Sequence, residues 1–215
     1  MGALKVDDTE RLEQEVIAAV VSRKHSFSVI REKYGVSAEG KFYLRDSEGP
    51  FDSFDVRIFF PADFPLGEPK VWEVGKRIPE TPNRHNSNGA CICVWEQWLA
   101  ETTDRSVEAY IDCPLSRYFV SQSVFEQTGE WPLDEEPHFR EGLVAAYSRT
   151  LGIPPEEDSV RRYLRALARG RLKGHFSCPC DSGRPLRHCH GEELRRLQTR
   201  IEPLLAKQML RRLSD

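Results

Sequence analysis

A chain of 215 residues holds one domain of ordinary size and a small appendage, but not a multi-domain assembly. With 39% hydrophobic and 30% charged residues and no apolar run near the roughly 18 to 20 residues of a membrane span, it is neither a bilayer-spanning nor a disordered chain. Residues 1–158 carry 17 Lys and Arg against 29 Asp and Glu, whereas residues 159–215 carry 14 against 5. An acidic body is therefore followed by a basic tail, which indicates a nucleic-acid or acidic protein partner, or only the solvated faces of amphipathic helices.

The first six residues lack the apolar core of a signal peptide, and Val6 stands where a myristoylation signal needs Ser or Thr. We therefore expect a cytoplasmic protein with no membrane partner. From Asp7 to Lys24 the apolar residues recur at helical spacing, which predicts an amphipathic helix with one buried face formed by Leu12, Val16, Ala19 and Val20.

Alternating apolar residues then predict an antiparallel meander of four short strands, around Phe27–Val29, Phe42–Leu44, Phe54–Phe60 and Val71–Val74. The stretch from Gly75 to Cys93 is rich in Pro, Asn and Gly and predicts a structured loop. Beyond Trp98, helical periodicity returns in segments that end at Gly129, Gly152 and Gly170, and a last helix is interrupted or restarted at Pro203. This order of elements predicts an α+β fold.

Six cysteines in a chain without a secretion signal indicate thiol chemistry or metal binding, because the cytosol keeps thiols reduced. They occur as Cys91-x-Cys93, a lone Cys113, and Cys178-x-Cys180 followed by Cys189. Cys91 and Cys93 fit a nucleophile, a redox pair, a relay of an acyl group between two thiols, or two half-buried thiols at a strand edge. Cys113 has no motif around it, and we expect it in the core.

Three motifs of the central segment follow one another in a recognisable order: Phe60-Pro-Ala-Asp-Phe-Pro65, Glu68-Pro-Lys-Val71, and Asn86-Ser-Asn-Gly89 with Ile92-Cys93-Val94. In this order they resemble the turn, strand and active-site segment of ubiquitin-conjugating enzymes, over about residues 7–150. The resemblance implies a UBC-like fold for residues 1–152, in which an N-terminal helix, a four-stranded meander and an active-site loop precede C-terminal helices.

The resemblance also implies an active cysteine that carries a protein acyl group as a thioester. Matching the family's Ile-Cys-Leu segment selects Cys93, which we favour, whereas an ungapped count from Asn83 selects Cys91. The count is ambiguous because Thr81 replaces the family's His and the loop is longer by about two residues. Asn83 or Asn86 is expected to donate to the oxyanion, and His85 to be structural.

Residues 122–142 add a second resemblance, because Gln122, Gly129-x-Trp131-Pro132, His138 and Gly142 are similar to a pattern in bacterial relatives of the family. Stand-alone proteins of this kind resemble the conjugating component of short antiphage CBASS operons. This implies a CD-NTase or a ubiquitin-like modifier as the protein client. A 215-residue chain leaves no room for an ATP-dependent activating domain, so an activating enzyme is expected in trans unless the donor differs. The alternative is a non-catalytic UBC-like module that binds proteins.

The C-terminal residues 153–215 form a basic helical extension with a knuckle at about 174–191. Two thiolates one residue apart, a Gly turn and a thiolate beside an imidazole can close a tetrahedral shell of Cys178, Cys180, Cys189 and His190. The pattern resembles the SEC-C motif, which implies structural zinc, a left-handed backbone at Asp181, and His190 rather than His188 as the fourth ligand. We expect a protein-docking role rather than specific nucleic-acid recognition, because no aromatic residues are interleaved for base stacking.

Overall fold

The computed structural model describes residues 6–132 and 139–214, and its internal contacts divide the chain into two compact units. We call Met1–Cys93 with Asp104–Glu135 the sheet unit, and Val94–Thr103 with Glu136–Asp215 the helical unit. The sequence predicts one boundary, after residue 152. The contacts instead assign two separate segments, residues 94–103 and 136–215, to the helical unit. Within the described ranges, every helix is too short or too polar to cross a membrane.

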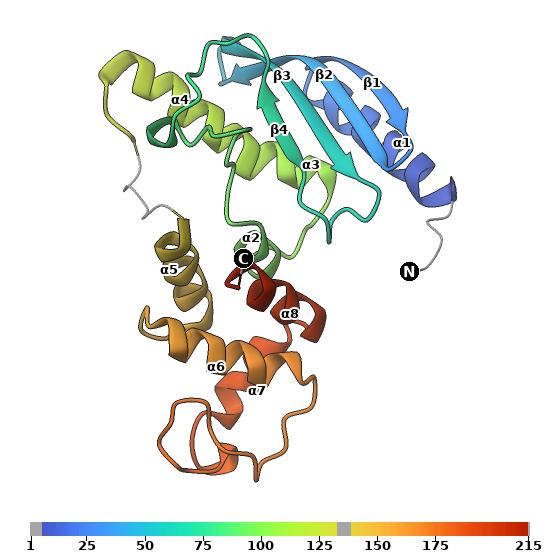
Figure 1. Ribbon diagram of the computed structural model, residues 1–215. Helices are drawn as coiled ribbons and strands as arrows, with labels where there is room; N and C mark the ends of the chain where they lie inside the picture. The colour runs from blue at the N-terminus through green and yellow to red at the C-terminus, as the bar shows by residue number, and fades with distance from the viewer. Residues whose placement is uncertain (1–5, 133–138, 215) are drawn as a thin grey trace. The chain divides into compact units, whose positions relative to one another are not determined.

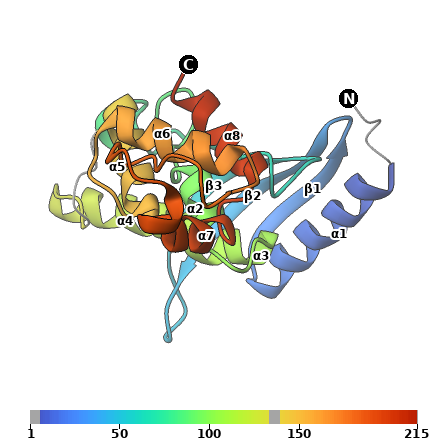
Figure 2. The ribbon, with the colours of Figure 1, turned by 90° about the horizontal axis from the view of Figure 1, so that it is seen from below.

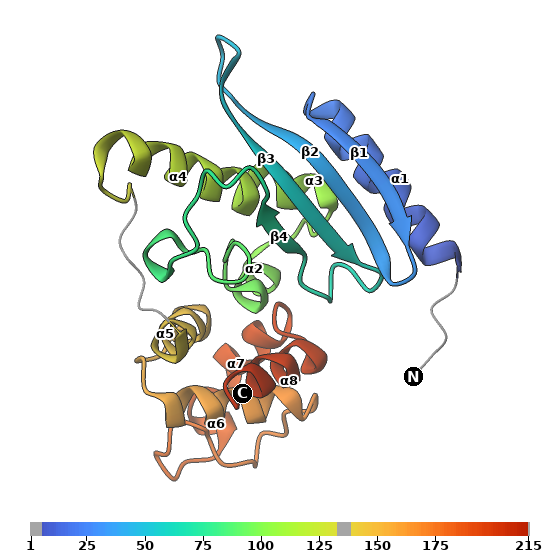
Figure 3. The same ribbon diagram turned by 45° about the horizontal axis from the view of Figure 1, so that its top comes forward.

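The sheet unit begins with a helix and an antiparallel sheet of four strands in sequential order, as predicted. Figure 3 shows the strands side by side in the order β1-β2-β3-β4. The bounds are α1 Val6–Ser22, β1 Ser26–Glu32, β2 Gly35–Arg45, β3 Pro50–Pro61 and β4 Lys70–Glu73.

One face of this sheet is apolar because every second residue of a strand points the same way. In β3 these residues are Phe54, Val56, Ile58 and Phe60, all at most 1% exposed. The predicted apolar face of α1 is buried as well, and α1 contacts β1 and β2 while running alongside β1 (Figure 2). The opposite sheet face carries exposed charged residues such as Glu39 and Arg57.

The sheet unit ends in a nearly continuous helical stretch, visible along the sheet in Figure 1. It consists of α3 Val107–Tyr110, the π-helical turn η2 Ile111–Leu115 and α4 Ser116–Thr128. Pro114 lies inside the π-helical turn, where a missing N–H interrupts the α-helical pattern. Phe119 of α4 packs on the sheet, with ring centroids 5.2 Å from Phe42 and 4.8 Å from Phe54. Cys113 in η2 is exposed, so its predicted place in the core is wrong.

The helical unit contains α2 Trp95–Glu101, α5 Phe139–Leu151, α6 Glu157–Ala168, α7 Gly191–Gln198 and α8 Pro203–Arg212. The predicted interruption at Pro203 is confirmed, because α8 starts there. Leu204, in the first turn of α8, is 50% exposed. The sequence did not predict α2, whose buried Glu96 accepts a hydrogen bond from the Tyr147 hydroxyl of α5 (2.9 Å) and lies 3.6 Å from Arg212 of α8.

Candidate functional site

The loop that carries Cys91 and Cys93 is anchored at its start by the last residue of β4. The Glu73 carboxylate accepts backbone hydrogen bonds from Gly75 (2.9 Å), Arg77 (2.7 Å) and Ile78 (3.1 Å). A single carboxylate thereby satisfies three backbone donors of the turn after the strand. The path of the loop is therefore fixed directly after the strand.

Asn86 closes the same loop from within. Its side chain is 5% exposed, and its Nδ2 donates to the carbonyls of Ile78 (3.1 Å) and Pro79 (3.4 Å). Asn86 also forms a β-bridge with Ala90, whose N–H donates to Val71 of β4 (2.8 Å). The amide of Asn86 thus binds the loop backbone, whereas the Asn83 side chain is exposed on the short 3-10 helix η1 Pro82–Arg84.

Helix α4 holds the loop through backbone carbonyls. Gln122, fully buried, accepts from Arg84 Nε (2.8 Å) through its amide oxygen and donates to the Arg84 carbonyl (2.6 Å) through its amide nitrogen. The Tyr118 hydroxyl donates to the carbonyls of Arg84 (3.3 Å) and His85 (3.4 Å). Just beyond α4, Trp131 Nε1 donates to the Asn83 carbonyl (3.0 Å). Three side chains therefore bind three consecutive loop residues.

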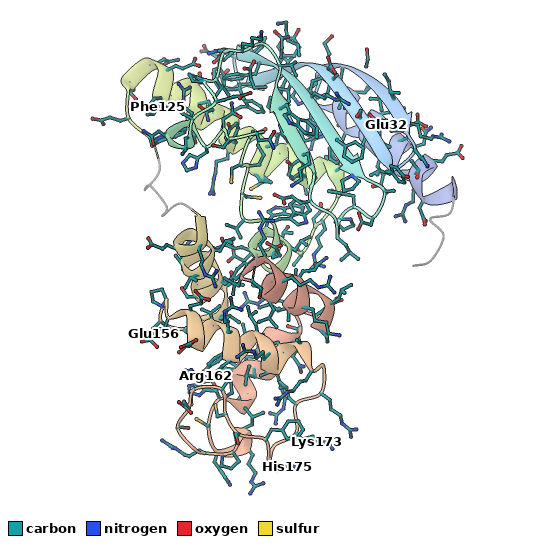
Figure 4. All side chains as sticks on the ribbon, in the orientation of Figure 1. Glu32, Phe125, Glu156, Arg162, Lys173 and His175 are labelled. Carbon is teal, nitrogen blue, oxygen red and sulfur yellow. The ribbon has the colours of Figure 1, made fainter. Side chains whose placement is uncertain are left out.

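An ion network surrounds this brace. Glu126 of α4 pairs with Arg77 (2.6 Å) and Arg84 (3.4 Å), and Arg77 also pairs with Asp52 of β3 (2.7 Å). The Arg77 guanidinium, together with hydrogen bonds from Ser123 and the Ser53 backbone, lowers the pKa of Asp52 to about 2 against the opposing effect of burial. Arg84 additionally stacks on Phe125, 4.7 Å from the ring centroid, on the part of α4 labelled in Figure 4.

The two cysteines differ in exposure. Cys91 is exposed and its backbone N–H donates to the His85 carbonyl (2.8 Å), while Cys93 is half-buried. Burial raises the pKa of Tyr118, and the negative charge of a Cys91 thiolate raises it further. Burial likewise raises the pKa of Tyr110, to which the charge of Cys93 contributes less. His85 adopts a left-handed backbone (φ 47°) with its ring 5.1 Å from that of Trp131. Cys91 therefore follows the part of the loop that α4 braces.

The second candidate site is a Cys/His cluster in the helical unit. Cys178, Cys180, Cys189 and His190 each offer one ligand atom, and the four atoms lie within 4.8 Å of one another. Separate distances are 3.5 Å between the Sγ atoms of Cys180 and Cys189, and 3.3 and 3.2 Å from His190 Nδ1 to the Sγ atoms of Cys178 and Cys189. Tetrahedral ligands with metal–sulfur bonds of about 2.3 Å are about 3.8 Å apart, so the cluster could hold one metal ion.

Two backbone features bring these ligands together. Asp181 has a left-handed conformation (φ 64°), as expected, and Gly183 has φ 70°, so the chain reverses within three residues. Backbone hydrogen bonds then pair Cys178 with Arg184 (3.0 Å) and Leu186 with Phe176 (2.8 Å). We call residues 171–188, which form this reversal and its two flanking segments, the knuckle hairpin.

Neighbouring side chains tune the cluster. Burial raises the pKa of the Cys178 thiol to about 11, while hydrogen bonds with Ser182 and the other thiols outweigh burial and lower that of Cys180 to about 6. The Ser182 hydroxyl lies 3.2 Å from Cys180 Sγ and 3.4 Å from Cys189 Sγ, and can donate to metal-bound thiolates. From α6, Arg162 Nε donates to the Pro179 carbonyl (2.9 Å), in the region labelled in Figure 4.

All four residues predicted as metal ligands are thus brought together, and His188 is outside the cluster, where its Nε2 accepts from Arg187. The structure places the predicted catalytic residues Cys91, Cys93, Asn83 and Asn86 on one loop, without testing their roles. Sequence reasoning missed Glu73 and Tyr118, but Gln122 and Trp131 stood in the bacterial pattern noted above. His138 of that pattern lies outside the described residues. No family model, no curated protein and no solved structure matches the chain.

Proposed function

We propose that the chain is a bacterial ubiquitin-conjugating-like cysteine acyltransferase. It carries a protein acyl group as a thioester on Cys93 or Cys91 and transfers that group to a target, in antiphage conjugation of the CBASS type with a CD-NTase as client. The observation that carries the proposal is a two-cysteine loop that directly follows a four-stranded meander and is braced by a buried glutamine from α4.

The chemistry that the proposal requires is transfer of an acyl group between two nucleophiles. The thiolate attacks the carbonyl carbon of an activated C-terminal acyl donor; a C–S bond forms and the donor's leaving group departs with the electrons of its bond. An amine of the target then attacks the thioester, loses a proton to solvent, and the thiolate leaves. Neither step changes an oxidation state, and a separate activating protein supplies the activated donor.

The braced loop suits this chemistry because a rigid nucleophile loses less freedom in reaching the transition state. The exposure of Cys91 gives an incoming protein access to that thiol, while Cys93 matches the family's segment. Each step passes through an oxyanion. The exposed Asn83 is the better side-chain donor for it, because the amide of Asn86 is already bound to Ile78 and Pro79.

In the helical unit, the Cys178, Cys180, Cys189 and His190 side chains would hold a structural zinc ion. Three thiolates and one imidazole are a donor set that zinc prefers, and four protein ligands leave no open position for a reacting water. The ion would link Cys178 and Cys180 of the knuckle hairpin to Cys189 and His190, which directly follow it. It has no part in the acyl transfer.

The test is co-expression of the full chain with the genes that flank its own. We expect an adduct on a non-reducing gel that thiol reductants remove. Cys93→Ser should convert this adduct to a hydroxylamine-sensitive oxyester or abolish it, and Cys91→Ser should weaken it less. Cys113→Ser is the matched control, since Cys113 is exposed but lies in η2 outside the loop.

The outcomes separate the alternatives. Loss of the adduct in Cys91→Ser alone means that Cys91 is the nucleophile and that the ungapped count from Asn83 is right. If neither loop substitution changes the adduct while a partner is still captured, the chain is a non-catalytic binding module and the proposal fails.

A further inference from the structure

The helical unit carries a concentration of positive charge that neither the acyl transfer nor the metal site explains. Between residues 165 and 188 there are six Arg and Lys residues and one acidic residue, Asp181. On the knuckle hairpin the basic residues are Arg171, Lys173, Arg184 and Arg187, all exposed. Figure 4 shows Lys173, with the neighbouring His175, extending away from the hairpin.

These side chains contribute no ion pair to the described part of the fold, although Lys173 Nζ lies 5.9 Å from the ring centroid of Phe176 and Arg187 Nε donates to His188 Nε2 (3.1 Å). Among the described residues of the helical unit, ion pairs engage Arg161 with Glu157, Arg196 with Glu192, and Arg212 with Glu96. Within the described ranges, the four hairpin residues take part in no ion pair. The same holds for Arg165, in the last turn of α6, and for Arg169, which directly follows this helix. A bound zinc ion and its three thiolates together carry one negative charge. The region therefore stays strongly positive with the metal in place.

The hairpin brings the four charges onto adjacent segments. The Arg187 N–H donates to the Gly174 carbonyl (3.0 Å), and the Cys178 N–H to the Arg184 carbonyl (3.0 Å). Arg171 and Lys173 therefore enter on the segment beside the one that carries Arg184 and Arg187. Of the metal ligands, Cys178 and Cys180 lie between these two segments in sequence, and Cys189 and His190 follow Arg187.

The surroundings select the kind of partner. A protein interface usually has an apolar centre with a polar rim. Of the large hydrophobic side chains that are exposed among the described residues, only Leu204 belongs to the helical unit, and it lies on α8 outside the hairpin. No exposed Phe, Tyr or Trp of the hairpin offers a platform for unstacked bases, since its only aromatic residue of these types, Phe176, is half-buried. Guanidinium groups bind phosphate oxygens with two parallel hydrogen bonds, and they predominate here.

We propose that the basic surface of the knuckle hairpin, formed by Arg171, Lys173, Arg184 and Arg187, binds the phosphate backbone of a nucleic-acid duplex without sequence preference. Such contacts orient a protein on a duplex but carry no sequence information. The inference concerns a different unit from the cysteine loop and does not depend on the proposed acyl transfer.

The test uses the metal-loaded full chain and a short fluorescein-labelled DNA duplex of random sequence, followed by fluorescence anisotropy. Four phosphate contacts predict that affinity falls on the order of a hundredfold when salt rises from about 50 to about 200 mM. Replacing all four hairpin residues by Gln, which keeps the side-chain stem of Arg187 against Gly174, should weaken binding at low salt at least about tenfold. A duplex of different sequence should bind equally.

The matched control replaces four exposed basic residues of the sheet unit by Gln: Lys24, Lys33, Lys76 and Arg117. It removes the same net charge, and its affinity should change less than about twofold. Equal losses in both variants would mean that net charge alone drives binding, which overturns the proposal. So would absence of binding at low salt, or tighter binding of poly-glutamate than of the duplex, which would assign the surface to an acidic protein. Zinc content, measured in both variants, verifies that the knuckle is intact.

Discussion

His25 shows at the scale of one residue how burial links protonation to stability. Its ring stacks on Phe42 with centroids 4.3 Å apart, and its Nδ1 accepts from the Tyr43 backbone (3.1 Å), which requires the neutral imidazole. Burial, with a lesser effect of the Arg45 charge, lowers its pKa to about 4. Asp112 opposes this shift and Arg23 adds to it. The folded sheet unit therefore excludes a proton that the unfolded chain accepts.

We predict that the sheet unit loses stability as the pH falls from about 6.5 to about 4. In this window the unfolded chain binds more protons at His25, so the free energy of unfolding rises with pH and falls on acidification. A shift of this size corresponds to at most about 3 kcal/mol. Urea unfolding at both ends of the window measures it, and His25→Phe should flatten this part of the profile while keeping the stack. An unchanged slope in the variant would assign the acid sensitivity to other groups.

Single residues also show which features of the structure can be predicted from the sequence. The left-handed backbone of Asp181 followed from a motif whose turn needs that conformation, and the structure confirms it. The orientation of the Asn86 amide could not be predicted in this way. It depends on the carbonyls of Ile78 and Pro79, which only the completed loop brings within hydrogen-bond distance.

At the scale of elements, α4 acts as a brace for the cysteine loop rather than only as a cover for the sheet. Gln122 is the centre of this brace because it satisfies both a side-chain donor and a backbone acceptor of Arg84. A buried amide with two partners is costly to remove, since its partners lose their hydrogen bonds away from water. The Arg84 carbonyl keeps the Tyr118 hydroxyl as a second donor.

We predict that Gln122→Met, which keeps the side-chain length but makes neither hydrogen bond, destabilises the sheet unit by about 1 to 3 kcal/mol. It should also change the rate at which iodoacetamide alkylates Cys91, because the Cys91 N–H binds the next loop residue, His85. Gln97→Met is the control, since Gln97 is half-buried in α2 and bonds only Glu101 among the described hydrogen bonds. Equal stability and alkylation rates in native protein and Gln122→Met would show that α4 does not position the loop.

The elements with a clear apolar periodicity, such as α1, α6 and β3, were predicted from the sequence. In contrast, α2 and α3 contain only seven and four residues. A helix of two turns or fewer is too short to show a clear apolar period in the sequence. Such helices are stabilised by contacts with residues that are distant in sequence. For α2 these are Tyr147 and Arg212 at Glu96, and Thr150 at Glu101 (2.9 Å).

For the whole molecule, the contacts divide the chain into two units that differ from a single boundary at residue 152. Segment 94–103 leaves the sheet unit and packs with α5 and α8, so the chain crosses between the units more than once. A single domain boundary placed along the sequence assumes that the chain passes from one unit to the other only once. The helical unit has its own buried residues, and the Cys/His cluster lies within this unit.

We predict about one zinc ion per chain in protein purified without chelator, because three thiolates and an imidazole converge within one short segment. Cys180→Ser should release the metal and weaken the helical unit. The reason lies in the contacts of the knuckle: Arg162 of α6 binds the Pro179 carbonyl, and α7 begins directly after His190. Metal analysis and unit-resolved amide hydrogen exchange measure the two effects.

Amides of the sheet unit should keep their protection in Cys180→Ser. The control is Cys113→Ser, which replaces an exposed cysteine outside the cluster and should change neither readout. Less than about a tenth of an equivalent of zinc in the native chain would contradict the metal site, because a closed four-ligand shell retains its ion through purification.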